Sequence, residues 1–255
     1  CIKSIRENSN FMDNKILVYV DQDNDGTVEW LREEKVDFIL NTAKECQGIG
    51  FAYDTMFSRA TTDLVVAFHA DMILGLLADK YMYDAHQRGT VVCATRIEPP
   101  IHPPGPEKIT MDLGNWPEQF NWDEFDKFVT VNSTKDSPLN KVTSGMFAPW
   151  LIDRRDHLGH DPMFKSVYED ADLFRRFVLS GYKLKQVWQG LVYHFTCRGG
   201  QFEHAVFDID LNFKSRSPQW EHNNLVSFRE YVRKWGGPFR EHGPCEPRPN
   251  IQHNI

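Results

Sequence analysis

The sequence contains no run of about 18 apolar residues, the length that a helix needs to cross a bilayer, and it therefore predicts no transmembrane segment. Basic residues are not in excess either, because the formal net charge is −7, whereas a surface that binds nucleic acid usually makes a domain basic. We therefore expect no nucleic acid as a partner. Internal repeats and low-complexity blocks are absent as well. With 255 residues, of which 41% are hydrophobic, the chain can fill a sizeable core, and we expect one compact α/β unit with a trailing C-terminal segment.

Cysteine is scarce and irregularly spaced. The five cysteines are an odd number and form no C-x-x-C pair. This pattern favours a reduced, cytoplasmic chain with free thiols. It leaves open a lumenal location with one unpaired thiol.

One stretch combines a buried strand with polar side chains at its end. Residues 64–68 are apolar and β-branched residues that stop at His69 and Asp71, which is typical of a strand covered on both faces. Open α/β sheets bind their ligands at the carboxyl ends of such strands. Because one residue separates His69 from Asp71, both side chains lean to the same side of an extended segment and can converge on one cation or phosphate.

The order of the expected elements indicates how the sheet is built. Apolar strands alternate with segments whose apolar residues recur at helical spacing. We expect strands at 15–20, 64–68 and 90–95, and helices at 27–46, 51–60, 73–87, 168–180 and 225–235. Strands separated by helices predict a mostly parallel sheet with crossover helices.

Further motifs follow one another along the chain. They are the acidic turn 21–27, the glycine-led helix 48–63, the His69-Ala70-Asp71 triplet, the segments 144–148 and 158–164, and the acidic helix start 168–173 with Arg176 and residues 181–184. In this order and spacing they resemble family 2 of the nucleotide-sugar glycosyltransferases, over about residues 1–198. The sequence departs from the family in lacking its opening strand, in having His69 at the first position of the D-x-D signature, and in having Tyr53-Asp54 in place of an Arg-Asn pair.

The resemblance implies a GT-A fold, an α/β architecture with a mostly parallel central sheet and helices on both faces. It implies a glycosyltransferase domain over residues 1–200, with donor binding in its first half and acceptor binding in its second, and a C-terminal extension over 201–255 packed on that domain. The implied activity is metal-dependent, inverting transfer of a sugar from a nucleoside-diphosphate donor, UDP- or GDP-linked, to a hydroxyl acceptor of the carbohydrate type.

The resemblance also assigns the metal site. Asp71 is the expected ligand of Mn²⁺ or Mg²⁺, because hard cations prefer carboxylate oxygen. His194 stands where the family has a further metal-binding histidine. His69 is a possible second ligand, which would favour Mn²⁺, or a contact to the ribose or phosphate of the donor.

The remaining roles fall on residues further from that triplet. Asp170 matches the catalytic base of the family, and the adjacent Glu169 would orient the acceptor or the loop. The other expected contacts are Asp21, Asp23 and Arg198 to the donor, and Gly145 and Trp150 to the acceptor. Each also has a plain structural interpretation, such as a helix N-cap for Asp71, helix N-terminal charges for residues 169–172, a core position for His194, and solvated loops for Asp23 and Arg198.

Two other functions are compatible with the sequence. A nucleotidyltransferase on a related sheet should carry a glycine-rich, basic phosphate loop near the start of its domain, and no such loop is visible. A non-catalytic sugar- or nucleotide-binding relative would explain His69 as the mark of a decayed metal site. The joint presence of Asp71, Asp170 and His194 argues against decay, because a relative that only binds its ligand has no need of all three.

Overall fold

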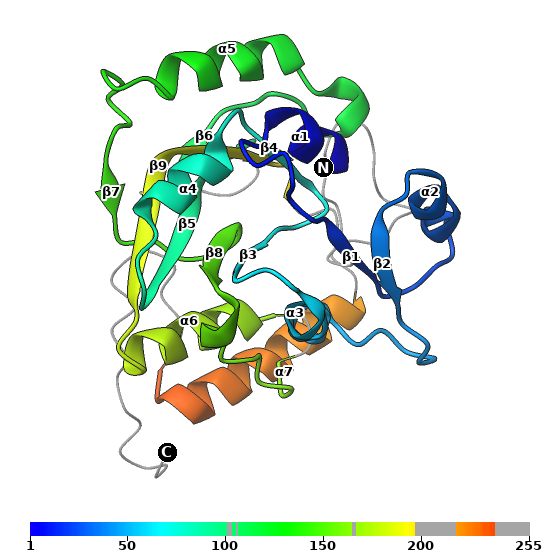
Figure 1. Cartoon of the computed structure of the whole chain (residues 1–255). Coiled ribbons are helices and arrows are strands. Elements are labelled where there is room, and N and C mark those ends of the chain that lie inside the picture. The colour runs from blue at the N-terminus through cyan, green and yellow to red at the C-terminus, as the bar shows by residue number, and fades with distance from the viewer. Residues whose placement is uncertain (101–103, 106, 165–166, 197–217, 238–255) are drawn as a thin grey trace.

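The computed structural model describes residues 1–100, 104–105, 107–164, 167–196 and 218–237 (Figure 1). Its first half contains α1 (Ile2–Asn8), β1 (Leu17–Val20), α2 (Thr27–Glu33), β2 (Asp37–Leu40), α3 (Ile49–Arg59), β3 (Leu64–Ala67), β4 (Met72–Leu74), α4 (Ala78–Ala85) and β5 (Thr90–Glu98). Its second half contains β6 (Lys108–Thr110), η1 (Pro117–Gln119), α5 (Trp122–Asn132), β7 (Val142–Thr143), β8 (Trp150–Asp153), η2 (Arg154–Asp156), α6 (Glu169–Leu179), β9 (Lys183–His194) and α7 (Pro218–Trp235). Among the helices so described, none is long and apolar enough to cross a membrane.

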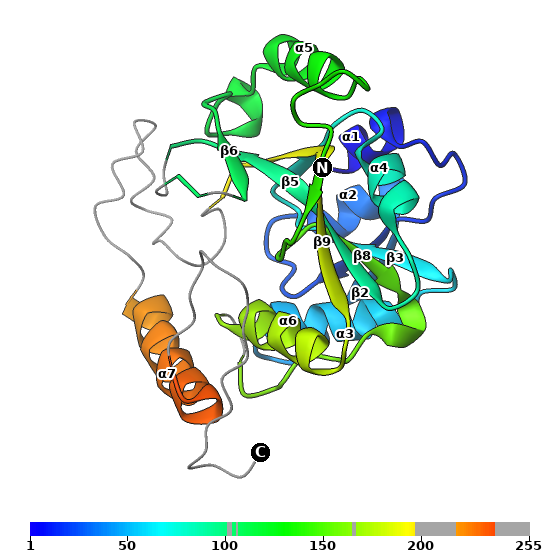
Figure 2. The ribbon, with the colours of Figure 1, turned by 90° about the vertical axis from the view of Figure 1, so that its left-hand side faces the viewer.

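A seven-stranded sheet forms the centre of the fold. Its strand order is β3-β8-β5-β9-β4, with β6 paired to β5 and β7 paired to β9. Helix α4 lies on one face of this sheet, and α3 and α6 lie on the other (Figures 1 and 2). Strands β1 and β2 form a separate parallel pair with its own small apolar cluster, built around Val20, Val28 and Leu31. The α/β architecture with helices on both faces is therefore confirmed.

The prediction of a mostly parallel sheet is wrong for the seven-stranded sheet. Parallel pairing holds for β5 with β9 and with β6, but β3 with β8, β5 with β8, β4 with β9 and β7 with β9 are antiparallel. One reason is that the short strand β4, which adds an antiparallel pairing, opens the segment predicted as a helix at 73–87. In the separate pair, β2 likewise lies inside the predicted helix 27–46. Runs of three or four apolar residues fit either period.

The pairing of β5 with β9 decides where the strand ends meet. Their register shifts at Ala94 and Thr95, so residues 188–190 of β9 bulge out of the pair before it resumes at Leu191. The two strands then stay parallel to their carboxyl ends, at Glu98 and His194. Strand β4 runs antiparallel to β9 with Met72 opposite His194, so the residue before β4, Asp71, comes to the same edge.

Helix α7 packs against α6. The indole Nε1 of Trp235 donates a hydrogen bond of 2.8 Å to Asp172, and Lys234 Nζ lies 2.7 Å from both Asp172 and Asp161. Tyr231 and Trp235 are buried in this contact. The expected boundary at residue 200 lies outside the described residues, so the division into a domain over 1–200 and an extension over 201–255 stays a prediction.

We predict that Gly75→Ala destabilises the protein. A Cβ atom at Gly75 would lie 2.5 Å from the carbonyl oxygen of Leu191 in β9, so the β4 end of the sheet must shift. We expect the free energy of unfolding to fall by about 1–3 kcal/mol, measured by urea denaturation. Gly237→Ala is the control, because a Cβ there meets no atom within 4 Å. Equal stability of the two variants would contradict the close approach of β4 to β9.

Candidate active site

Two histidines and one aspartate meet at the carboxyl edge of the sheet. One ligand atom each from His69, Asp71 and His194 lies within 4.8 Å of the others, and Asp71 Oδ2 is 3.4 Å from His194 Nε2. The rings of His69 and His194 are inclined to each other by 65°, with centroids 5.9 Å apart. The strand register described above produces this convergence, since β4 starts and β9 ends at the same place. The predicted convergence of His69 and Asp71 is present, and His194 joins them.

Glu98 is hydrogen-bonded to the ring nitrogen of His194 that faces away from Asp71. His194 Nδ1 lies 2.8 Å from Glu98 Oε1, and the buried Glu98 carboxylate also pairs with Lys108 at 2.8 Å and with Arg96 at 3.4 Å. A carboxylate on one ring nitrogen fixes the ring orientation and directs the other nitrogen outward, as is common for metal-binding histidines. Sequence reasoning missed Glu98. The available signal was its position at the end of the β-branched strand that begins at Thr90.

Burial and charge set the protonation of the three groups. Burial, with the positive charge of His194, lowers the pKa of His69 to about 4, so this imidazole is neutral at neutral pH. Burial raises the pKa of Asp71, but the hydrogen bond and charge of His194 outweigh it and hold the pKa below its usual range. Burial lowers the pKa of His194, yet its bonds to Asp71 and Glu98 raise it overall. The cluster therefore offers one ionised carboxylate and one neutral imidazole, and a divalent cation that binds would take the place of the proton on His194 Nε2.

A pair of carboxyl groups begins α6. Burial raises the pKa of Glu169 to about 8, and the charge of Asp170 adds to this effect. Burial also raises the pKa of Asp170, against the hydrogen bond of 2.7 Å from the Ala171 backbone N–H. The pair therefore retains a proton near neutral pH. Glu169 Oε2 is buried and has no hydrogen-bond partner in the described part of the chain.

Tyr53 lies beside the histidine cluster, because its ring stacks on that of His69 with centroids 6.0 Å apart. Its buried hydroxyl makes no hydrogen bond to the described residues. Burial raises the pKa of Tyr53 well above its usual value, and the charges of Asp71, Glu169 and Asp170 raise it further. The charges of both groups therefore act on this one phenol. Sequence reasoning noted Tyr53 as a departure from the family without giving it a role.

The two aspartates expected at the donor base have other contacts. Asp21 accepts hydrogen bonds of 2.9 Å from Asn41 Nδ2 and from the backbone N–H of Gln47, and one of 3.1 Å from that of Gly48. It therefore ties β1 to the loop before α3. Asp23 accepts a 3.2 Å bond from the backbone N–H of Val28 at the start of α2. A donor contact by either residue stays a prediction.

The two residues expected to contact the acceptor, Trp150 and Gly145, both have structural roles. Trp150 is only 2% exposed and belongs to the main apolar core, so the prediction that it contacts an acceptor is wrong, because its ring has no accessible face. Gly145 lies in a close backbone approach, because a Cβ atom there would lie 2.3 Å from Gln186 Cβ. This explains the glycine by packing. Arg198 lies outside the described residues.

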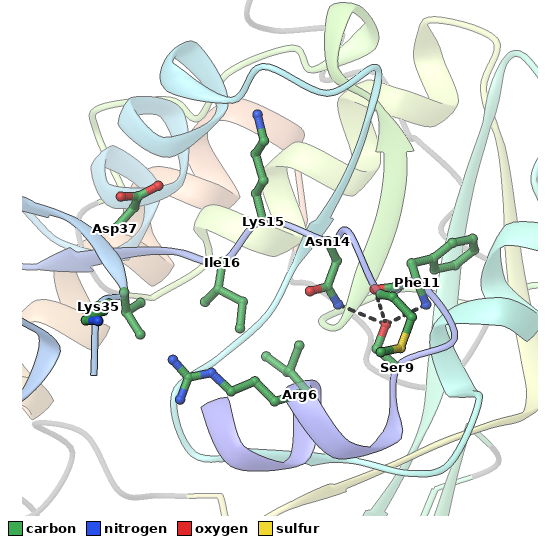
Figure 3. Close-up of a pocket in the computed structure, with 11 residues that line it drawn as sticks. Arg6, Ser9, Phe11, Asn14, Lys15, Ile16, Lys35 and Asp37 are labelled. Atoms are coloured by element: carbon green, nitrogen blue, oxygen red, sulfur yellow. Dashed lines mark hydrogen bonds between the residues drawn. The ribbon is translucent and has the colours of Figure 1, made fainter. Parts of the chain in front are cut away.

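A separate pocket opens between α1 and the β1–β2 pair (Figure 3). Its volume is about 350 Å³, and it contains none of the site residues named above. Its polar groups are engaged by the fold: Arg6 pairs with Glu34 at 2.6 Å and Lys15 bonds Thr61 at 3.0 Å. Ser9 and Asn14 are joined at 2.9 Å. We therefore place the candidate chemistry at the histidine cluster and not in this pocket.

Comparison with known proteins identifies the family. Residues 1–135, more than half of the 255, match the family model described as glycosyl transferase family 2. The chain belongs to glycosyl transferase family 2. A crystal structure of GalNAc-T7 with UDP, GalNAc and Mn²⁺ is similar, with a TM-score of 0.51 and 13% identity, over 71% of this chain and 37% of that chain. One of S. aureus TarS 1-349 in complex with UDP has a TM-score of 0.47 and 10% identity, over 92% of this chain and 67% of that chain. A search of curated proteins found no match.

The likeness to GalNAc-T7 shows that this family 2 chain has the fold of the GT-A glycosyltransferases. The chain spans a little over a third of the length of that structure, at 37%. The family match ends at residue 135, so Glu169, Asp170 and His194 all lie beyond it. For this family 2 chain, the structure therefore supplies the link between Asp71 in the matched part and His194 in the remainder.

We predict that Glu98→Gln lowers the pKa of His194. The substitution keeps the side-chain shape but removes one of the two negative charges that raise this pKa. NMR titration of the histidine rings in metal-free protein measures the change. His86, which has other charged neighbours, is the control in the same spectra. An unchanged pKa of His194 would show that Glu98 does not face it in solution.

Proposed function

We propose that this chain transfers a sugar from a nucleoside-diphosphate donor to a hydroxyl acceptor, with inversion at the anomeric carbon and with a divalent cation. The observation that carries the proposal is the meeting of Asp71, His194 and His69 at the carboxyl edge of the sheet. The charges of the Glu169–Asp170 pair act on Tyr53, which stacks on His69. Family 2 membership makes nucleotide-sugar transfer the chemistry that fits this arrangement.

The ligand atoms of Asp71, His69 and His194 support a cation site at this cluster. Asp71 is ionised and His69 is neutral at neutral pH, and Glu98 orients His194. These three ligands suit Mn²⁺ better than Mg²⁺, because imidazole nitrogen is a borderline donor that Mg²⁺ rarely takes. When bound, such a cation neutralises the charge that develops on the diphosphate leaving group.

Asp170 is the proposed general base. The acceptor oxygen forms a bond to the anomeric carbon, and the bond from that carbon to the diphosphate oxygen breaks with its electron pair on the leaving group. The acceptor hydroxyl gives its proton to the Asp170 carboxylate. Burial strengthens this base by raising its pKa. When Glu169 holds the proton of the pair, it places no second negative charge beside Asp170, and it can donate a hydrogen bond to the acceptor.

Uridine is the proposed nucleoside of the donor. The support is the likeness in fold to the GalNAc-T7 structure, which holds UDP and Mn²⁺. Asp21 and the loop that it fixes before α3 are the part of the chain proposed to face the nucleoside. For the sugar and the acceptor we propose only a chemical class: a hexose for the sugar, and a carbohydrate-type hydroxyl for the acceptor.

We predict that UDP stabilises the protein only when Mn²⁺ is present, and that Asp71→Asn abolishes this effect. A ligand at about 100 times its Kd adds about 2.7 kcal/mol to the folded state. Thermal unfolding with UDP, GDP, Mn²⁺, Mg²⁺ and EDTA measures it, with the exposed Asp13→Asn as control. Equal stabilisation of the Asp71→Asn protein would refute the cation site, and stabilisation by GDP alone would refute the assignment of uridine.

We predict that Asp170→Asn removes transfer and donor hydrolysis while leaving the UDP–Mn²⁺ stabilisation intact, because the base contacts the acceptor proton and not the diphosphate. Loss of a general base costs about 10²–10⁴-fold in rate. Glu169→Gln should keep measurable activity, with the rate still falling as pH drops through the raised pKa of Asp170, since the base must be ionised. An inactive Glu169→Gln protein beside an active Asp170→Asn protein would reverse the two roles.

A further inference from the structure

A second group of metal-competent side chains lies outside the proposed donor site. Asp54 of α3 faces His157 and His160, which follow η2 in the chain. Asp54 Oδ1 lies 2.7 Å from His157 Nε2 and 2.7 Å from His160 Nδ1. One ligand atom from each of the three residues lies within 4.8 Å of the others. Three ligands from two distant segments therefore face one point.

Three hydrogen-bonding groups converge on the Asp54 carboxylate. The two imidazole nitrogens each lie 2.7 Å from Oδ1, and the backbone N–H of His160 is shared between Oδ1 at 3.1 Å and Oδ2 at 2.9 Å. A cation bound between the side chains would take the place of two imidazole protons and let both rings present lone pairs.

The ligand side chains are held in place by packing. The ring of His157 stacks on Phe57 with centroids 3.9 Å apart, and that of His160 stacks on Tyr53 at 5.8 Å. The two imidazoles are 7% and 4% exposed, whereas the Asp54 side chain is 35% exposed. Gly50 makes room for His160, because a Cβ atom at that position would lie 2.9 Å from His160 Cβ. The site is thus rigid on the histidine side and open at the carboxylate.

The charges also suit a cation. Burial lowers the pKa of His157 more than Asp54 raises it, so this imidazole carries a lone pair at neutral pH. Burial raises the pKa of Asp54, but its bonds to the two histidines hold the pKa far below its usual range. His157 Nδ1 is buried without a hydrogen-bond partner in the described residues, so Nε2 is the nitrogen through which this ring interacts.

We propose that Asp54, His157 and His160 bind a second divalent cation of the zinc class, at a site distinct from the Asp71 cluster. Two imidazoles and one carboxylate with a fourth position open form a donor set that zinc favours. Tetrahedral ligands at zinc distances lie about 3.3 Å apart, so binding moves the Asp54 carboxylate outward by about half an ångström, toward its exposed side. This inference does not depend on the proposed transferase activity.

The role of this cation follows from what the loop at 157–161 contacts. Arg176 of α6 donates hydrogen bonds to the carbonyl oxygens of Leu158 and Gly159, and Lys234 of α7 pairs with Asp161. The cation would add a link from this loop to α3. Tyr53 stacks on His160 on one side and on His69 on the other, with centroids 6.0 Å apart, so the link would also support the ring that borders the first cluster.

Zinc binding to the Asp71→Asn protein tests the proposal, because that substitution removes the carboxylate of the first cluster. Equilibrium dialysis should show one tightly held Zn²⁺ per chain. Adding Asp54→Asn should weaken that binding at least about tenfold, whereas adding Asp63→Asn, an exposed carboxylate near the same loop, should not. Equal zinc binding with and without Asp54→Asn would overturn the proposal.

A measurement on Asp71→Asn alone keeps the test decisive if the Asp54 variant does not fold. Co²⁺ added to the folded Asp71→Asn protein should give the visible d–d absorption of a tetrahedral site, and Zn²⁺ should displace it. Absence of these bands together with absence of bound Zn²⁺ would overturn the proposal. The three residues would then be a hydrogen-bonded anchor that ties the loop to α3.

Discussion

The parallel pairing of β5 with β9 is the contact on which the candidate site depends. It carries Glu98 and His194 to adjacent strand ends, and the antiparallel addition of β4 to β9 sets Asp71 beside them. The bulge of residues 188–190 adjusts the register in the middle of the pair. Without that adjustment, His194 would fall out of step with Glu98 and lose the carboxylate that orients its ring. Backbone hydrogen bonding thus determines the geometry of a cluster of side chains.

Burial gives these side chains their chemistry. An exposed carboxyl pair at a helix start would be ionised at neutral pH, but Glu169 and Asp170 are desolvated and keep a proton between them. Desolvation also keeps His69 neutral. Asp71 stays ionised because His194 compensates for its burial. The same low dielectric therefore produces neutral and charged groups a short distance apart, according to which partner each group has.

Membership of family 2 rests on the first half of the chain, whereas the proposed base and the third metal ligand come from the second. The departures from the family are structurally connected. Tyr53 stacks on His69, which replaces the first Asp of D-x-D, and also on His160, while Asp54 binds His160. The replaced residues thus form one continuous contact from the first cluster to the second.

The sequence by itself determined the α/β class and the strand that ends before His69, because apolar strands and helix starts have clear local patterns. The candidate roles of Asp71, Asp170 and His194 came from the resemblance to family 2 and stay predictions. It misassigned β2 and β4, since runs of three or four apolar residues are equally compatible with a helix. It also placed Trp150 at an acceptor site, because burial of an aromatic ring leaves no local mark. Only the tertiary structure decided that Glu98 supports His194 and that Asp54 meets His157 and His160. These contacts join residues about 100 positions apart, and side-chain proximity over that separation depends on how the sheet pairs and which helices cover it.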